Sequence, residues 1–190
     1  MKEDRLRIIS VTGAHSSVGK TTLCSILLNN LKDFGAIKCT KSDLYSSVTN
    51  DPGIINETDK DTAVMSASGA ARVVWVQSTY DDLERTLGMA LEQMQGLKGI
   101  IVEGNSPSDF LKPDLRIFIA DPAYAIKPIA VRFMQEADLV VINSGIISED
   151  VHEECHNPPK GIPVFMIDLM KQTGDIDNFL THIQKYMMRD

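Results

Sequence analysis

The stretch GAHSSVGKTTLC at residues 13–24 places the strongest constraint on how this chain folds. It follows residues 7–12 (RIISVT), a short, β-branched and apolar run that is typical of a buried strand. It leads into apolar residues at helical spacing, after which Gly35 supplies a stop signal. Those apolar residues are Leu23, Ile26, Leu27, Leu31 and Phe34. The sequence therefore predicts a strand, a loop and a helix in that order.

The loop itself nearly matches GxxxxGK[ST], a pattern that cradles phosphate groups. Gly19, Lys20 and Thr21 match it, while Ala14 stands where the pattern has its first glycine. In such a loop the backbone N–H groups point at an anion, the lysine contacts the β- and γ-phosphates, and the hydroxyl binds Mg²⁺. We therefore predict that the loop binds a nucleotide. The predicted binding residues are Gly13, Ala14, His15, Ser16, Ser17, Val18, Gly19, Lys20, Thr21 and Thr22.

An acidic residue follows the apolar run at residues 99–102, and a glycine comes next (GIIVEG). An acid at the end of a strand can hold Mg²⁺ directly or through water, which is the part that we predict for Glu103. The alternative is a solvated acid at a strand end. Glu103 is therefore predicted both as a metal ligand, with Thr21, and as a catalytic residue.

A second metal-binding acid is expected within residues 57–62 (ETDKDT), because Mg²⁺ usually takes one or two protein carboxylates. Asp61 is the predicted ligand and Asp59 the rival. The alternative is that Asp59 or Thr58 only caps the helix that follows.

Two lysines lie at the end of the second predicted strand, residues 36–40. Lys38 and Lys41 could each face the γ-phosphate from the side opposite Lys20 and offset charge that develops during phosphoryl transfer. An exposed lysine pair is the alternative. We predict Lys20, Lys41 and Glu103 as the catalytic residues, and Lys38 stays open as the rival of Lys41.

Asn143 follows the apolar run LVVI at the position where a base-reading amide is expected. A guanine-specific NKxD motif would place a lysine and an aspartate after it, but the chain reads NSGI from Asn143. Asn143 is therefore predicted to contact the nucleotide, and ATP and GTP both remain candidates.

Short apolar runs and helical patterns alternate along the rest of the chain. Further strands are predicted at residues 72–77, 99–102, 116–120, 139–142 and 163–169, and further helices at residues 59–70 and 176–187. Another helix is predicted to start near Ser78 or Thr79 and to continue to Met94, while residues 129–137 and 148–155 are expected to be helical or loop-like. The strands are almost continuously apolar, which indicates cover on both faces. We predict one P-loop nucleotide-binding domain over residues 1–190, of the α/β class. It would be a three-layer α/β/α sandwich with a mostly parallel sheet and the P-loop NTPase fold. The polar residues 41–57 are expected to lack regular structure.

The net charge of -7 argues against broad binding to nucleic acid or to an anionic membrane, because both attract basic surfaces. No apolar run approaches the roughly 20 residues that span a bilayer. The three cysteines form no CxxC pair, so we expect a reduced, cytoplasmic protein. His152, Cys155 and His156 suggest a metal site, but an acidic helix end is the preferred interpretation.

Five segments together resemble the MobB-like proteins of molybdopterin-guanine dinucleotide biosynthesis, within the SIMIBI class of P-loop NTPases. They are GAHSSVGKTTL, AIK, DKDTAVMSASGA, RVVWV and IIVEG, and the resemblance covers roughly the first three quarters of the chain. The loop is also similar to those of dethiobiotin synthetase and cobyrinic acid a,c-diamide synthase. His15 departs from the class, because dimerising members often carry a lysine there.

The resemblance implies a parallel sheet flanked by helices, Mg²⁺ with a nucleoside triphosphate, and a homodimer. It also implies that Thr21, Glu103 and an acid of residues 59–61 surround the metal, with Lys41 or Lys38 as the second-strand lysine. The expected function is Mg²⁺-dependent binding and slow hydrolysis of ATP or GTP, which helps a cofactor-biosynthesis or metalloenzyme partner to make a molybdenum or other metal cofactor. The alternatives are an ATP-dependent small-molecule ligase of the dethiobiotin synthetase type and a nucleotide-gated switch.

Overall fold

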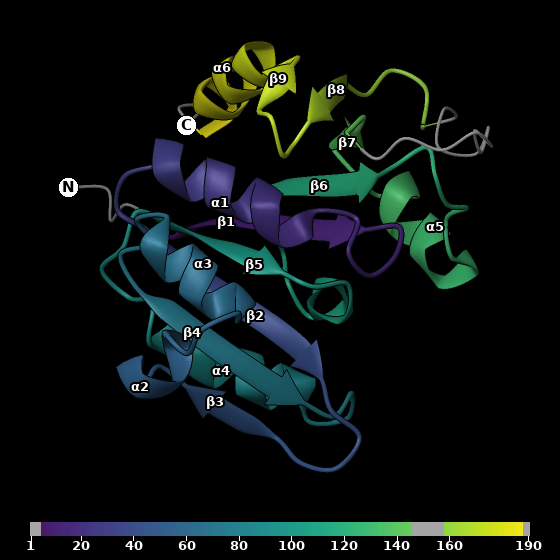
Figure 1. The fold of residues 1–190 in the computed structure, drawn as a ribbon. Coiled ribbons are helices and arrows are strands. Elements are labelled where there is room, and N and C mark those ends of the chain that lie inside the picture. The colour runs from purple at the N-terminus through teal and green to yellow at the C-terminus, as the bar shows by residue number, and fades with distance from the viewer. Residues whose placement is uncertain (1–4, 146–157, 188–190) are drawn as a thin grey trace.

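The computed structural model describes residues 5–145 and 158–187, which form a nine-stranded sheet with helices on both faces (Figure 1). Seven of the described strands run parallel to one another, and only the two outermost strands, β3 and β9, run antiparallel to the strands beside them. In spatial order they are β3 (Ser47–Thr49), β4 (Val73–Ser78), β2 (Phe34–Lys41), β5 (Gly99–Glu103), β1 (Arg7–Gly13), β6 (Leu115–Ala120), β7 (Leu139–Asn143), β8 (Val164–Asp168) and β9 (Thr173–Gly174). His152, Cys155 and His156, and with them the segment 148–155, lie outside the described residues.

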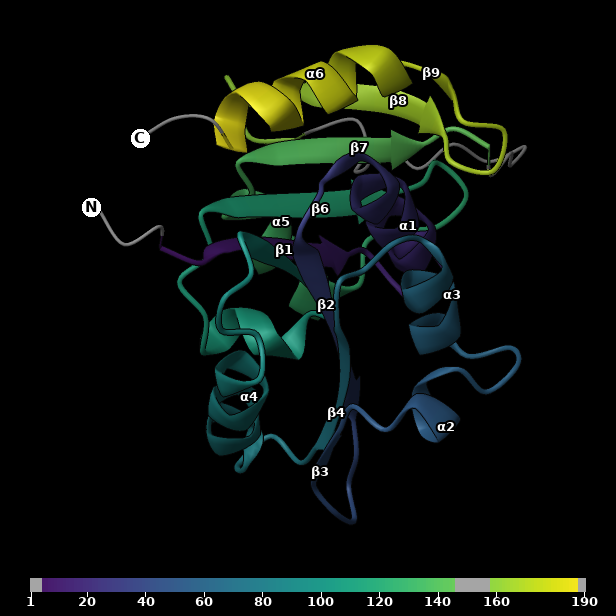
Figure 2. The ribbon, with the colours of Figure 1, turned by 90° about the vertical axis from the view of Figure 1, so that its left-hand side faces the viewer.

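The helices divide between the two faces of the sheet. They are α1 (Lys20–Asn30), α2 (Pro52–Ile55), α3 (Asp61–Ala67), α4 (Leu83–Glu92), α5 (Pro128–Gln135) and α6 (Ile176–Met187), with a short 3₁₀ turn, η1 (Ser106–Asp109). Figure 2 shows α4 on one side of the sheet and α1 and α3 on the other. The apolar contacts place α6 with α1 and α3, and α5 on the face that α4 covers.

The strand β5 shows why the apolar runs are continuous. Ile101 packs with the α1 layer, while Ile100 and Val102 pack with the α4 layer, and all three are fully buried. Each such side chain stabilises the fold by roughly 1.5–3 kcal/mol relative to an exposed one. Alternate residues therefore face different helical layers, and the predicted three-layer α/β/α P-loop fold is confirmed.

The segment expected to lack regular structure contains two short elements, so that prediction was wrong. The strand β3 pairs antiparallel with β4, and α2 follows it. The Asp51 carboxylate accepts a hydrogen bond from the Gly53 backbone N–H at 2.7 Å and caps α2, whose first residue is Pro52. A capped turn with proline at its first position is a favourable start for a helix, which explains α2. The strand β3 has only three residues, too few to give a periodic pattern in the sequence.

The strand order brings several strand ends to one place. In the sheet β5, β2 and β4 lie on one side of β1, and β6, β7 and β8 lie on the other, so the chain crosses from one side to the other between β5 and β6. In open parallel sheets ligands bind beyond the carboxyl ends of the strands at such a switch point. The loop after β1 lies there. None of the described helices is long and apolar enough to cross a membrane.

Candidate functional site

The loop between β1 and α1 is held in a strained, inward-turned shape. Ser17 and Gly19 have φ values of 65° and 111°, and left-handed residues of this kind turn successive N–H groups toward one concave surface. A Cβ atom on Gly19 would lie 2.7 Å from Leu169 Cδ1 and 3.0 Å from Asn143 Nδ2. The second glycine of the motif is therefore required by both its backbone angle and its neighbours.

Two amide side chains fix the loop to the sheet. Asn105 Nδ2 donates to the Gly13 carbonyl at 2.9 Å, and its Oδ1 accepts from the Gly13 N–H at 2.9 Å. Asn143 Nδ2 donates to the Val18 carbonyl at 3.1 Å, and its Oδ1 accepts from Leu169 N–H at 3.4 Å. Because Asn143 is only 4% exposed, its geometry is that of a support beneath the loop rather than of a group that reads the base.

His15 and Lys20 are tied together within the loop. The His15 ring contacts the fully buried Asp121 carboxylate through Nε2 and the Ser16 carbonyl through Nδ1. Lys20 Nζ donates to the His15 carbonyl at 2.9 Å. Burial lowers the pKa of Lys20, and the nearby Glu103 carboxylate partly opposes that shift. The lysine that the motif assigns to phosphate therefore rests against the loop itself.

The predicted metal-binding oxygens converge at the end of β5. In the sheet register Glu103 lies between Val11 of β1 and Lys38 of β2. Glu103 is 1% exposed; its Oε2 accepts from the Thr21 hydroxyl at 3.0 Å, and its Oε1 lies 2.5 Å from Lys38 Nζ. Lys38 Nζ also lies 2.6 Å from Asp61 Oδ2. A single ammonium group thus bridges two carboxylates that come from distant parts of the chain.

Lys38, and not Lys41, belongs to this group of side chains. Burial lowers the pKa of Lys38, but the Glu103 and Asp61 carboxylates outweigh burial and leave that pKa above its ordinary value. Lys41 is exposed and pairs with Asp43 at 3.1 Å. The register of β2 against β5 explains the difference. Lys38 pairs with Glu103, the last residue of β5, whereas Lys41 lies on the part of β2 that extends beyond the end of β5.

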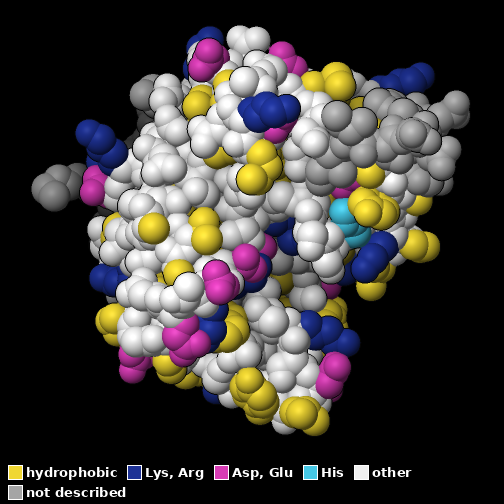
Figure 3. Space-filling view, viewed as in Figure 1, with side chains coloured by type: hydrophobic (Ala, Val, Ile, Leu, Met, Phe, Trp, Pro, Cys, Tyr) yellow, Lys and Arg dark blue, Asp and Glu magenta, His cyan; other side chains and the backbone are white. Residues whose placement is uncertain are grey.

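A groove of about 580 Å³ joins the loop to these carboxylates. It is lined by Ser16, Ser17, Gly19, Lys20, Thr21, Thr22, Lys38, Cys39, Thr40, Lys41, Asp61 and Glu103. Figure 3 shows a hollow on this face of the molecule, with Lys or Arg side chains at its edge. The rival acid Asp59 has a φ of 67° and does not line the groove; it lines a neighbouring pocket of about 250 Å³ that shares Lys38 and Asp61 with the groove. Ala14 and Val18 are fully buried, and the Ala14 N–H donates to the Ile119 carbonyl at 2.8 Å, so these two predicted binding residues pack beneath the loop.

Sequence reasoning gave no part to Asn105 or Asp121 in shaping the loop. Asp121 follows the buried strand β6 directly, as Glu103 ends β5, so the same signal of an acid at a strand end marks it. Asn105 follows Gly104, whose φ of 141° turns the chain back toward the loop. The Asn105 amide contacts the Gly13 backbone, which lies on β1, and no local sequence pattern predicts a contact between these two distant segments.

Comparison with known proteins gives a fold and no family. No model of a protein family matches the chain, and no curated protein sequence matches it. HypB from Helicobacter pylori, solved in complex with nickel, aligns with a TM-score of 0.57 and 13% identity, over 97% of this chain and 88% of that one. LpxK from Aquifex aeolicus, solved in complex with ATP, aligns with a TM-score of 0.53 and 17% identity, over 85% of this chain and 53% of that one. The structures align over most of this chain, but the sequence identity is low. The comparison therefore identifies only the architecture, which is the P-loop NTPase fold.

Proposed function

We propose that this protein binds a nucleoside triphosphate together with Mg²⁺ at the groove of about 580 Å³ and hydrolyses it slowly. The observation that carries the proposal is the convergence of the Thr21 hydroxyl and the Glu103 and Asp61 carboxylates beside a loop of inward-turned N–H groups. Hydroxyl, carboxylate and phosphate oxygens are the ligands that Mg²⁺ prefers.

The donor set fits a metal that arrives with its nucleotide. Among the described residues no cluster of three or more His, Cys, Asp and Glu side chains could hold a metal alone. Mg²⁺ usually takes one or two carboxylates and completes its octahedron with water and phosphate oxygens. When bound, the ion supplies positive charge between the phosphates. Thr21 and Glu103, with Asp61, would hold it, and Lys38 would leave the space between the two carboxylates.

The remaining steps belong to the chain. Lys20 exchanges the His15 carbonyl for a phosphate oxygen, and the loop N–H groups hold the β-phosphate against α1. Lys38 stays beside the γ-phosphate and offsets charge that develops there. Slow hydrolysis is part of the proposal because Glu103, which would hold the metal with Thr21 and Asp61, would not be available to take a proton from the attacking water.

The biological role that we propose is assistance in metal-cofactor assembly, with a partner enzyme and as a homodimer. It is supported by the resemblance of DKDTAVMSASGA and IIVEG to the MobB-like proteins. The similar fold of HypB, a structure that contains nickel, agrees with a part in metal handling. ATP and GTP are both proposed ligands, because Asn143 supports the loop instead of facing a base.

Calorimetric titration with ATP and with GTP, each with and without Mg²⁺, tests the proposal. We expect Mg²⁺-dependent binding that Lys20→Ala abolishes. Lys32→Ala is the matched control, because Lys32 is exposed after the far end of α1, and it should leave binding unchanged. Binding that survives Lys20→Ala, or no binding of either nucleotide, would show that the loop is not the site.

A further inference from the structure

Lys38 is an internal cation at the metal-binding oxygens. Its Nζ lies 2.5 Å from Glu103 Oε1 and 2.6 Å from Asp61 Oδ2. The other two lysines that line the groove have different partners, because Lys20 donates to a carbonyl of the loop and Lys41 pairs with an exposed aspartate. Among the described residues, Lys38 is therefore the ammonium group that rests on the carboxylates proposed for Mg²⁺.

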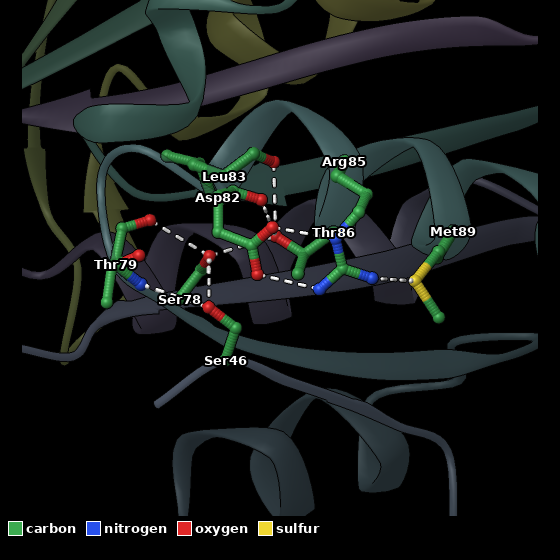
Figure 4. Close-up of polar contacts among 8 residues, drawn as sticks. All are labelled: Ser46, Ser78, Thr79, Asp82, Leu83, Arg85, Thr86 and Met89. Carbon is green, nitrogen blue, oxygen red and sulfur yellow. Dashed lines mark hydrogen bonds and ion pairs between the residues drawn. The ribbon is translucent and has the colours of Figure 1, made fainter. Parts of the chain in front are cut away.

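The backbone of Lys38 is held in place, so a change of partners must come from its side chain. The strand β2 lies between β5 and β4, and its last residue, Lys41, pairs with Ser78 at the end of β4. Figure 4 shows that Ser78 is held in turn by hydrogen bonds, with Ser46 Oγ at 3.2 Å and Thr86 Oγ1 at 3.1 Å. A lysine side chain is long and flexible and carries its donors at the tip. Lys38 can therefore exchange one acceptor for another without a change in the sheet.

Lys38 and Mg²⁺ compete for the same carboxylates. Glu103 is 1% exposed, so little water screens one cation from another at its oxygens. A divalent ion held by Glu103 and Thr21 would therefore repel the ammonium group strongly. The ion can enter only when Lys38 leaves, and the cost of leaving depends on the acceptor that the ammonium group finds next.

The γ-phosphate is the acceptor that the groove gives to a displaced Lys38. Lys38 lines the same groove as Lys20, the residue that the motif assigns to the β- and γ-phosphates. The carboxylates in the lining of the groove are Asp61 and Glu103, and both would hold the ion. A triphosphate therefore supplies a new partner, whereas a diphosphate has no phosphate at that position. Asp59 is the competing acceptor, because it lies in the neighbouring pocket that Lys38 also lines.

We infer that Lys38 makes the metal site selective for a nucleoside triphosphate over a diphosphate, an inference that rests on the proposed nucleotide site. With a diphosphate, Lys38 stays on Glu103 and Asp61 and keeps Mg²⁺ from them. With a triphosphate, Lys38 moves to the γ-phosphate and leaves the two carboxylates to the ion. Once hydrolysis has removed the γ-phosphate, Lys38 returns to the carboxylates, which favours release of the diphosphate.

The test measures how Mg²⁺ changes the Kd of each nucleotide, by calorimetry on the full chain. The ligands are the diphosphate and the non-hydrolysable β,γ-methylene triphosphate of the base that binds. In the wild type, Mg²⁺ should strengthen binding of the triphosphate analogue and leave binding of the diphosphate nearly unchanged. In Lys38→Met the ion displaces no ammonium group, so Mg²⁺ should strengthen diphosphate binding as well. The expected gain is about tenfold to a hundredfold, the effect of one hydrogen bond to a charged group.

Three further variants complete the test. Lys38→Gln removes the charge but keeps a donor for Glu103, so it should behave like Lys38→Met and replaces that variant if it does not fold. Lys41→Met is the matched control, because Lys41 pairs with Asp43 and not with the metal-binding carboxylates; its diphosphate binding should stay independent of Mg²⁺. Asp59→Asn should also behave like the wild type. If wild-type diphosphate binding depends on Mg²⁺ and Asp59→Asn removes that dependence, the ammonium group moves to Asp59 and the inference is wrong.

The outcomes separate this inference from the proposed function. If Mg²⁺ changes diphosphate binding equally in the wild type and in the Lys38 variants, Lys38 does not control the metal site, while Mg²⁺-dependent triphosphate binding that requires Lys20 still stands. If neither nucleotide binds, or binding survives Lys20→Ala, the nucleotide site is wrong and the selectivity of Lys38 falls with it.

Discussion

Replacing Lys38 by methionine removes the ammonium group that bridges Glu103 and Asp61, while it keeps most of the side-chain volume. Glu103 is 1% exposed, and removal of one partner of a buried ion pair typically destabilises a protein by about 3–5 kcal/mol. Two features lower that figure here. The Thr21 hydroxyl still donates to Glu103, and Asp61 is 50% exposed, so water screens its charge. We expect a loss of about 3 kcal/mol.

That loss is measurable by thermal unfolding of the ligand-free protein. In a chain of 190 residues, about 3 kcal/mol lowers the Tm by roughly 6–12 °C. Lys41→Met is the matched control, because Lys41 pairs with the exposed Asp43 and such surface pairs contribute about 0–1 kcal/mol. Because the pKa of Lys38 is raised, its contribution is complete below the ordinary lysine pKa and is lost only as the pH rises through the higher value of the folded state. The difference in Tm should thus stay constant from neutral to mildly alkaline pH.

Millimolar MgCl₂ without nucleotide gives a second measurement. The divalent ion can occupy the space that the ammonium leaves between the two carboxylates, and a ligand that binds only the folded state raises its stability. Mg²⁺ should therefore raise the Tm of Lys38→Met more than that of the wild type. Equal Tm values for Lys38→Met and Lys41→Met, or no selective effect of Mg²⁺, would refute the assignment of Lys38 to the metal-binding carboxylates.

Three further substitutions test other parts of the site. Gly19→Ala introduces a Cβ 2.7 Å from Leu169 Cδ1 at a φ of 111°. We expect the free energy of unfolding in urea to fall by about 1–3 kcal/mol and nucleotide binding to disappear in calorimetry. Wild-type stability and binding would contradict the strained loop. Asn143→Ala should weaken ATP and GTP binding equally, whereas loss of one nucleotide alone would make Asn143 a base-reading group. The hydrogen bonds from Arg85 lower the pKa of Asp82 to about 2. Its contribution to stability is complete above the ordinary aspartate pKa and disappears as the pH falls through about 2. Asp82→Asn should therefore be less stable than the wild type at neutral pH and equal to it in strong acid, and a difference independent of pH would contradict this.

Most of the fold follows from local patterns in the sequence. The strand before the loop, predicted at residues 7–12, is β1 (Arg7–Gly13), and the terminal helix predicted at residues 176–187 is α6 (Ile176–Met187). Both carry strong periodic or β-branched signals. The helix predicted at residues 59–70 is shorter, because Asp59 has a positive φ and α3 begins at Asp61. The antiparallel pairings of β3 and β9 involve three-residue and two-residue strands, which are too short to be recognised from sequence.

Some residues of the site can be predicted from local sequence and others cannot. The loop motif and the acid that ends β5 are each recognised from one short segment of the sequence. The choice between Lys38 and Lys41 depends on the register of β2 against β5, which pairs Lys38 with Glu103. The support from Asn143 depends on the position of Leu169, at the end of β8. Register and contacts between distant segments are set by the packing of the whole sheet, so no local pattern reveals them.

The two ends of the sheet limit how copies of this protein can meet. In the described chain the outermost strands are β3 and β9, which are short and run antiparallel to their neighbours; Pro52 follows β3 closely in sequence, and Gly174 is the last residue of β9. Such blunt edges oppose the addition of a further strand from another molecule. Two copies would then join through helices or through the loops at the carboxyl ends of the strands. The second arrangement would bring the two phosphate loops toward each other, because each loop lies beyond the carboxyl ends of the strands.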